Sequence, residues 1–160
     1  MNHKYIIELL DFEIKNDKIY LLIEYAENGD LFSFIKHFSS MSFKNQMTMF
    51  YKIILSVKYL HDNQMVHRDI KPENIMITNT LRPKLADFGS TNVKKDMSKT
   101  FCGTYEYMAP EIYRRGLQNE KVDIWALGVL LYEITQCKTP FKGLTLNEIE
   151  QIVQGKKLRF

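Results

Sequence analysis

Residues 67–74 read His-Arg-Asp-Ile-Lys-Pro-Glu-Asn, and this stretch decides the fold of the chain. It places one acid, Asp69, between two bases, Arg68 and Lys71, and it ends in an amide. Pro72 has no backbone N–H and breaks a helix, so the sequence predicts a loop here. A loop so rich in opposite charges, lying between two apolar segments, indicates a function beyond turning the chain.

Four further motifs accompany this loop. Spaced as H-R-D-x-x-x-x-N, the loop itself resembles the catalytic loop of eukaryotic protein kinases. The other motifs follow it in the order of that family: Asp87-Phe88-Gly89, Thr100–Thr104, Ala109-Pro110-Glu111 and Asp123-Ile124-Trp125. The chain is therefore similar to eukaryotic serine/threonine protein kinases over essentially all of its 160 residues. The segment around Thr100 looks like that of the Aurora, cyclic-nucleotide-dependent and calcium-regulated groups.

The resemblance implies a protein-kinase-like fold of the α+β class. Residues 1–24 would form the end of the small lobe, and residues 25–160 would form a large lobe that is incomplete at its C-terminus. The hydrophobic pattern agrees, because it predicts a small sheet followed by many helices. The expected strands are 6–12, 19–24, 75–77 and 84–86, and the expected helices are 31–38, about 42–63, 122–135 and 145–153.

Three of these segments carry more detailed predictions. Ser42 is a plausible N-cap for the long helix, whose apolar face is expected at Met47, Phe50, Ile54 and Val57. The helix at 122–135 is apolar nearly all round, which predicts a buried central helix. Residues 87–111 lack sustained periodicity and predict a long functional loop.

Composition bounds the class of protein. A net charge of +3 is a mild excess spread along the chain, typical of a solvated surface, and nucleic-acid binding is not expected. The two cysteines show no metal or disulfide spacing, which favours a reducing compartment, so we expect a cytoplasmic or possible nuclear location. The longest uncharged apolar run is far short of the roughly 20 residues that span a bilayer, so no membrane association is expected.

The resemblance implies roles in phosphoryl transfer for four residues. The transfer needs an acceptor for the hydroxyl proton, cations around the phosphate, and hard oxygen ligands for Mg²⁺. By resemblance, Asp69 is the catalytic base and Lys71 neutralises the transferring phosphate, and a lysine here points to serine or threonine substrates. Asn74 and Asp87 would be the Mg²⁺ ligands, with Asp87 placed by Phe88 and free to turn because of Gly89.

ATP would bind near the end of the second strand. The resemblance puts the adenine-binding backbone near Glu24 and Ala26, with Ile23 at the gatekeeper position. Asp30 would bond the ribose hydroxyls, and Met76 would pack beneath the adenine ring. Each of these five residues has an alternative interpretation as an ordinary packing or turn residue.

Further residues match structural positions of the family. Leu9, His67 and Phe88 match an apolar stack that joins the two lobes. Asp123 matches a residue that bonds the backbone of the catalytic loop. Glu111 matches a glutamate that pairs with an arginine far downstream, and no candidate for that arginine lies before Phe160.

Two residues suggest how substrates and regulation would work. Glu73 sits where basophilic kinases carry a glutamate, so we expect arginine or lysine two or three residues before the phosphoacceptor. Thr100 lies four residues before Thr104, as in kinases activated on this loop. A phosphate on Thr100 would pair with Arg68, next to the catalytic base.

Some family motifs are not found between residues 1 and 160. The Gly-rich loop, the ATP-orienting lysine and its helical glutamate partner would all precede this region, so we expect a fragment of a longer kinase. Residues 1–160 alone should then be nearly inactive and poorly soluble. A non-catalytic kinase-like module that binds partners is the alternative, but intact Asp69, Asn74 and Asp87 favour an enzyme. A small-molecule kinase is disfavoured by the Ala109-Pro110-Glu111 segment.

Overall fold

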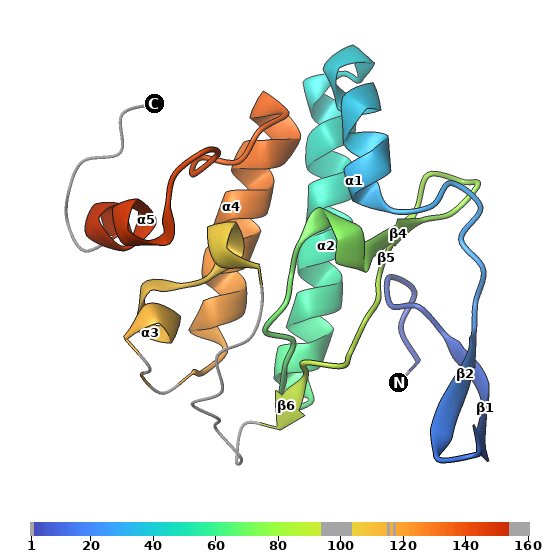
Figure 1. Ribbon diagram of the computed structural model, residues 1–160. Helices are drawn as coiled ribbons and strands as arrows, with labels where there is room; N and C mark the ends of the chain where they lie inside the picture. Colours follow the sequence, from blue (N-terminus) through green and yellow to red (C-terminus); the bar gives the residue numbers. More distant parts are fainter. Residues whose placement is uncertain (1, 94–103, 115, 117, 154–160) are drawn as a thin grey trace.

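The computed structural model describes residues 2–93, 104–114, 116 and 118–153, and it has the expected α+β class (Figure 1). Its strands form three antiparallel pairs, β1–β2, β3–β6 and β4–β5. The strands are β1 (Leu9–Lys15), β2 (Lys18–Ile23), β3 (Met65–Val66), β4 (Ile75–Ile77), β5 (Pro83–Leu85) and β6 (Asn92–Val93). The helices are α1 (Leu31–Phe34), α2 (Phe43–Asp62), α3 (Pro110–Tyr113), α4 (Lys121–Gln136) and α5 (Leu146–Val153), with short 3-10 turns at Ile35–Ser40, Pro72–Asn74 and Tyr105–Tyr107.

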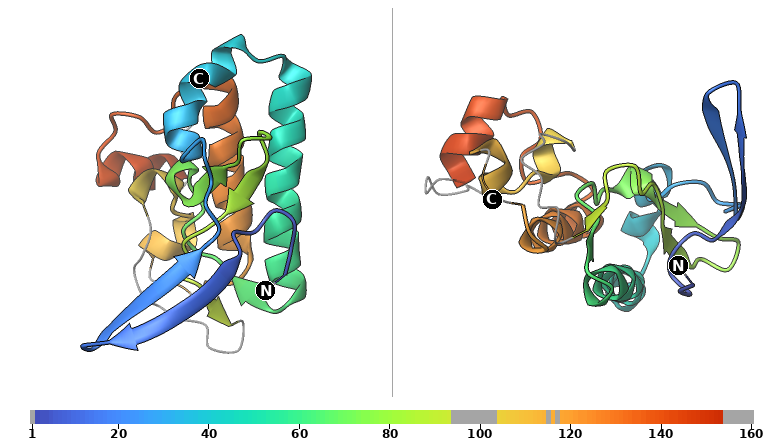
Figure 2. Two further views of the ribbon diagram at one scale, coloured as in Figure 1. Left: turned by 90° about the vertical axis from the view of Figure 1, so that its right-hand side faces the viewer. Right: turned by 90° about the horizontal axis from the view of Figure 1, so that it is seen from below.

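Strands β1 and β2 form a hairpin, which we call the ribbon. Its two-residue turn is Asn16-Asp17, and both residues have positive φ angles of 50° and 57°, which matches the twist of a tight hairpin. The first strand begins at Leu9 rather than Ile6, because Ile6 and Ile7 are buried beside β5, where the Ile7 N–H donates to the Leu85 carbonyl at 2.9 Å. Every residue of the ribbon strands is exposed, and Figure 2 shows the ribbon projecting away from the helices.

The long helix α2 begins where the sequence predicts. The Ser42 hydroxyl accepts from the Asn45 N–H at 3.4 Å, and this cap satisfies one of the free donors of the first turn. The predicted apolar face is confirmed at Val57, which is buried, and at Phe50 and Ile54, which are half-buried and pack against the core, while Met47 is half-buried without being part of that core. The helix lies against α4 and β5, and the stripe that faces them is Met49, Ile53, Val57 and Leu60.

Helix α4 was expected to be buried on all sides, and this expectation was wrong on one side. Val122, Ala126, Leu130 and other residues of one face are buried in the core. On the opposite face, Ile124 is 52% exposed. Two acidic residues of α4, Asp123 and Glu133, are nevertheless buried. The helix therefore carries ionisable groups into the core, and these need hydrogen-bond partners.

Three other expectations are refined. The helix expected at 31–38 is α-helical over Leu31–Phe34 and continues as the 3-10 turn Ile35–Ser40. Pro72 opens a short 3-10 turn at its first position, where its missing N–H costs nothing. The expected loop at 87–111 contains β6 and the turn Tyr105–Tyr107, while residues 94–103 lie outside the described part. Within the described residues, no helix is long and apolar enough to cross a membrane.

Candidate active site

The Asp123 carboxylate fixes the start of the catalytic-loop motif. Its Oδ2 accepts from the His67 N–H at 2.9 Å and from the His61 Nε2–H at 2.8 Å, and its Oδ1 accepts from the Arg68 N–H at 2.8 Å. Asp123 is 1% exposed, so these three bonds replace its lost hydration. They also hold Arg68 at a φ of 68°, which is uncommon for a residue other than glycine. Sequence reasoning predicted Asp123 here but missed His61.

His67 links the loop to the strand that precedes Asp87. Its ring is fully buried, donates from Nε2 to the Ala86 carbonyl at 3.0 Å and accepts at Nδ1 from the Asp69 N–H at 3.3 Å. Burial lowers the pKa of His67, which favours the neutral ring that this bonding pattern needs. The ring meets Phe88 edge-on at 5.3 Å between centroids, as the predicted stack requires. Leu9, its third member, lines a cleft together with Phe88.

Asp69, Lys71, Asn74 and Thr104 form one bonded group. Lys71 Nζ lies 2.9 Å from Asp69 Oδ2 and donates to Thr104 Oγ1 at 3.0 Å. Asn74 Nδ2 donates to the Asp69 backbone carbonyl at 2.8 Å and to its Oδ2 at 2.9 Å. Among the described residues, no donor takes up the Asn74 Oδ1. The structure thus brings together four residues that the sequence singled out.

Asp87 stands at the other end of the site. Its carboxylate is exposed, and its Oδ1 accepts from the Gly89 N–H at 3.2 Å. Its φ of 56° lies in the left-handed region, a local strain that is frequent at functional sites. A Cβ on residue 89 would lie 3.2 Å from that same Asp87 oxygen, and glycine avoids this close contact.

A cleft of about 770 Å³ separates the ribbon from the rest of the molecule. One wall consists of apolar ribbon side chains, and the other carries both predicted metal ligands and one predicted nucleotide residue, Met76; the lining is Ile7, Leu9, Leu21, Ile23, Glu73, Asn74, Met76, Ala86, Asp87, Phe88 and Gly89. Three predicted ATP-binding residues are not in this lining. The Glu24 carboxylate turns to Lys84, Ala26 is buried, and Asp30 Oδ1 caps α1 by accepting from the Ser33 N–H at 2.7 Å.

Comparison with known proteins agrees with this geometry. Residues 1–159 match the protein kinase domain family. The chain belongs to the protein kinase family. It is 38% identical over its whole length to a cAMP-dependent protein kinase catalytic subunit-like protein of Caenorhabditis elegans, and 39% identical over 98% of its length to the human NUAK family SNF1-like kinase 1. The resemblance to eukaryotic serine/threonine kinases is thereby confirmed.

A third relative is the putative serine/threonine-protein kinase A of Trypanosoma brucei brucei, 37% identical over 91% of the chain. In each of these comparisons the chain spans less than half of the relative: 40% of the nematode protein, 24% of the human one and 36% of the trypanosome one.

Three carboxylates of this kinase domain lie near one another, and sequence reasoning found one of them, Glu73. Burial raises the pKa of Glu133 to about 7, and the charges of Glu73 and Glu106 add to this shift. The Tyr107 hydroxyl donates to Glu133, and Glu106 accepts from the Thr139 hydroxyl at 2.6 Å. An acidic residue inside the apolar run of α4 was the sequence signal that could have revealed Glu133.

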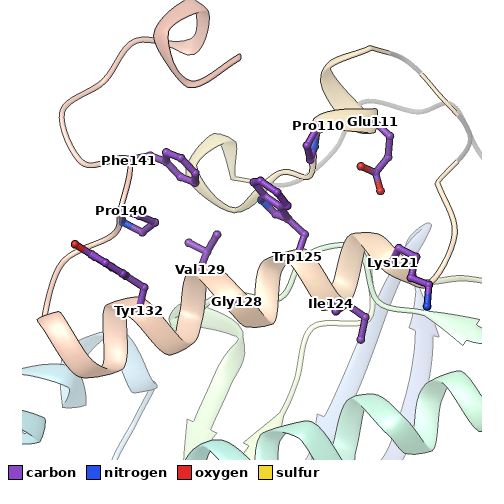
Figure 3. Close-up of a pocket in the computed structure, with 10 residues that line it drawn as sticks. All are labelled: Pro110, Glu111, Lys121, Ile124, Trp125, Gly128, Val129, Tyr132, Pro140 and Phe141. Atoms are coloured by element: carbon purple, nitrogen blue, oxygen red, sulfur yellow. The ribbon is translucent and has the colours of Figure 1, made fainter. Parts of the chain in front are cut away.

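Glu111 lies at a different place in this kinase domain. Figure 3 shows it at one end of an apolar groove of about 650 Å³ along the exposed face of α4, where Trp125 and Phe141 stack with ring planes 6° apart. In the described part of the chain, Glu111 has no ionic partner. Its predicted arginine partner therefore stays a prediction.

Arg68 is a further predicted site residue. Its Nε donates to the Ser90 carbonyl at 2.6 Å, while its Nη1 is buried and has no hydrogen-bond partner among the described residues. Thr100, its predicted phosphorylated partner, lies outside the described residues. A buried guanidinium nitrogen without an acceptor costs free energy. An anion that accepted a hydrogen bond from it would therefore be stabilised.

The Asp123 network gives a stability prediction. Asp123→Asn replaces one carboxylate oxygen by an NH2 group, which cannot accept from the N–H that it faces. We expect the free energy of unfolding of the intact protein to fall by about 1–3 kcal/mol in urea denaturation. Asp62→Asn is the control: it alters an exposed carboxylate paired with Lys58 and should cost less than about 0.5 kcal/mol. Equal losses in both variants would contradict this account of the loop.

Proposed function

We propose that this chain carries the catalytic loop of an ATP-dependent kinase that phosphorylates serine or threonine hydroxyls of proteins. The observation that supports this most is the bonded group of Asp69, Lys71, Asn74 and Thr104 beside a cleft that ends at Asp87. Phosphoryl transfer asks a protein mainly for positioning and charge compensation, and this group supplies both.

Asp69 would act as the base. Asn74 Nδ2 and Lys71 Nζ both hold its Oδ2, so the carboxylate is fixed in orientation and its Oδ1 can accept the proton of a substrate hydroxyl. Lys71 would bring its positive charge to the transferring phosphate, and its bond to Thr104 ties the loop to the segment that receives the substrate.

Asn74 and Asp87 have the chemistry of a Mg²⁺ site. Both offer hard oxygen atoms: the Asn74 Oδ1 takes no donor among the described residues, and the Asp87 carboxylate is exposed at the cleft. A Mg²⁺ ion held there would neutralise charge on phosphate oxygens. The donor set therefore fits the ion that the family implies.

ATP would enter the cleft with its adenine between Ile23 and Met76, which face it from opposite walls. The backbone carbonyl of Glu24 and the N–H of Ala26 make no backbone hydrogen bond to another described residue, so both are available to the adenine edge. One oxygen of Asp30 caps α1, and the other would accept hydrogen bonds from the ribose hydroxyls.

The role of Asp69 is tested by Asp69→Asn in the intact protein. The amide keeps the shape but cannot take a proton, so we expect kcat to fall by about 10²–10⁴. The KM for ATP should stay within about threefold, because Asp69 touches no part of the nucleotide in this proposal. Asp62→Asn on α2 is the matched control and should retain full turnover. A wild-type protein without turnover, but with a protein partner, would favour the non-catalytic module instead.

The three carboxylates Glu73, Glu106 and Glu133 support a preference for basic substrates. We expect a peptide with arginine two or three residues before its serine to be phosphorylated faster than one with methionine there. A bound guanidinium favours the ionised form of Glu133, whose pKa is about 7, so the affinity for the arginine peptide should rise between pH 6 and pH 8. The methionine peptide is the control and should lack this rise. A peptide array without any basic preference would reject the proposal.

Activation by phosphorylation is proposed for Thr100. A phosphate adds about −1.5 to −2 charges and would give the buried Arg68 Nη1 its missing acceptor. Thr100→Ala in the intact protein should therefore lower kcat by at least about tenfold, the effect of roughly 1.4 kcal/mol in the barrier. Thr80→Ala, in the exposed turn between β4 and β5, is the control. Phosphatase treatment that leaves activity unchanged would refute the role of Thr100.

A further inference from the structure

A lysine is buried beneath the junction of the ribbon with the rest of the molecule. Lys84 lies on β5, is 8% exposed, and places its Nζ 2.5 Å from Glu24 Oε2, one residue after β2 ends. The same oxygen accepts from the Glu8 N–H at 3.3 Å. Of the ion pairs between described residues, this one alone connects the end of the ribbon to β5.

Burying the charged group of Lys84 at this position costs free energy, because the ammonium loses its hydration. Its neighbours on β5, Pro83 and Leu85, are buried, and an apolar residue at 84 could pack there without losing hydration. Lys84 lines a small cavity of about 100 Å³ together with Lys4 and Glu8, so one like and one opposite charge share this cavity with it. Glu24 is the partner that stabilises the ammonium group, and the two charges fix each other's position more tightly than apolar packing would.

From Lys84 the chain runs directly to the proposed metal ligands. Leu85 is held by the Tyr5 carbonyl and the Ile7 N–H, and the Ala86 N–H donates to the Asn74 carbonyl at 2.8 Å. Asp87 follows at once. On the other side, Glu24 lies two residues before Ala26, in the segment proposed to bind adenine. The ion pair therefore connects the segment proposed to bind adenine with the strand that leads to the proposed metal ligands, and only a few hydrogen-bonded residues lie between them.

We propose that Lys84 is a positioning residue, whose ion pair with Glu24 holds the adenine-binding segment at a fixed distance from Asn74 and Asp87. The inference rests on the proposed binding of ATP in this cleft. A ligand that touches both ends of the cleft gains from that fixed distance, whereas a ligand that touches one end does not.

The test compares two ligands of the intact protein, adenosine and ATP with Mg²⁺, by titration calorimetry. Lys84→Met removes the charge and keeps the apolar stem, and the partly exposed Glu24 can then turn to water, so the protein should still fold. We expect the Kd for Mg²⁺·ATP to rise about tenfold, because the two ends of the cleft are no longer held in register. The Kd for adenosine should change by less than about twofold, since adenosine touches the Glu24 end alone.

Two further variants separate positioning from general stability. Lys84→Arg keeps the charge and should restore Mg²⁺·ATP binding to within about threefold of the wild type. Lys58→Met breaks the exposed pair with Asp62 on α2 and should change neither Kd. Equal weakening of both ligands by Lys84→Met would overturn the inference, as would no change in either. A wild-type protein that binds neither ligand would refute the proposed function itself.

Discussion

The buried Asp123 carboxylate is the constraint on which the site depends. A charge this deep is tolerated because three N–H donors surround it, two from the backbone of the catalytic loop and one from His61. Those donors come from α2 and from the loop, while Asp123 itself belongs to α4. The loop is thus tied to the two longest helices of the core, and its strained Arg68 backbone persists because the surrounding bonds leave no relaxed alternative.

Two groups near this core respond to pH in opposite directions. Burial lowers the pKa of His67, so its contribution to stability is complete above its ordinary pKa of 6.5 and is lost as pH falls below that value. Burial raises the pKa of Glu133 to about 7, so its contribution is complete below its ordinary value of 4.5 and is lost as pH rises toward 7. Both shifts have the same origin, because burial in each case disfavours the charged form.

The sequence predicted local features well and contacts between distant residues less well. The N-cap at Ser42 and the spacing of Asp69 and Asn74 depend on neighbouring residues, so a linear pattern could reveal them. The buried stripe of α2 depends on where α4 and β5 lie, and several rows at three- and four-residue steps fit an amphipathic helix. His61 and Asp123 are 62 positions apart, and no local pattern connects them.

The two walls of the cleft are held by forces of different kinds. The catalytic-loop wall rests on a large apolar core between α2, α4 and the β4–β5 pair, where Leu60, Ile75 and Leu130 are fully buried. The ribbon wall is a two-stranded hairpin whose residues are all exposed, an arrangement of marginal stability by itself. Among the described residues, its attachment includes the buried Ile6 and Ile7 and the ion pair of Glu24. Catalytic groups are therefore fixed by the core, while the wall that would face the adenine depends on a few contacts at its base.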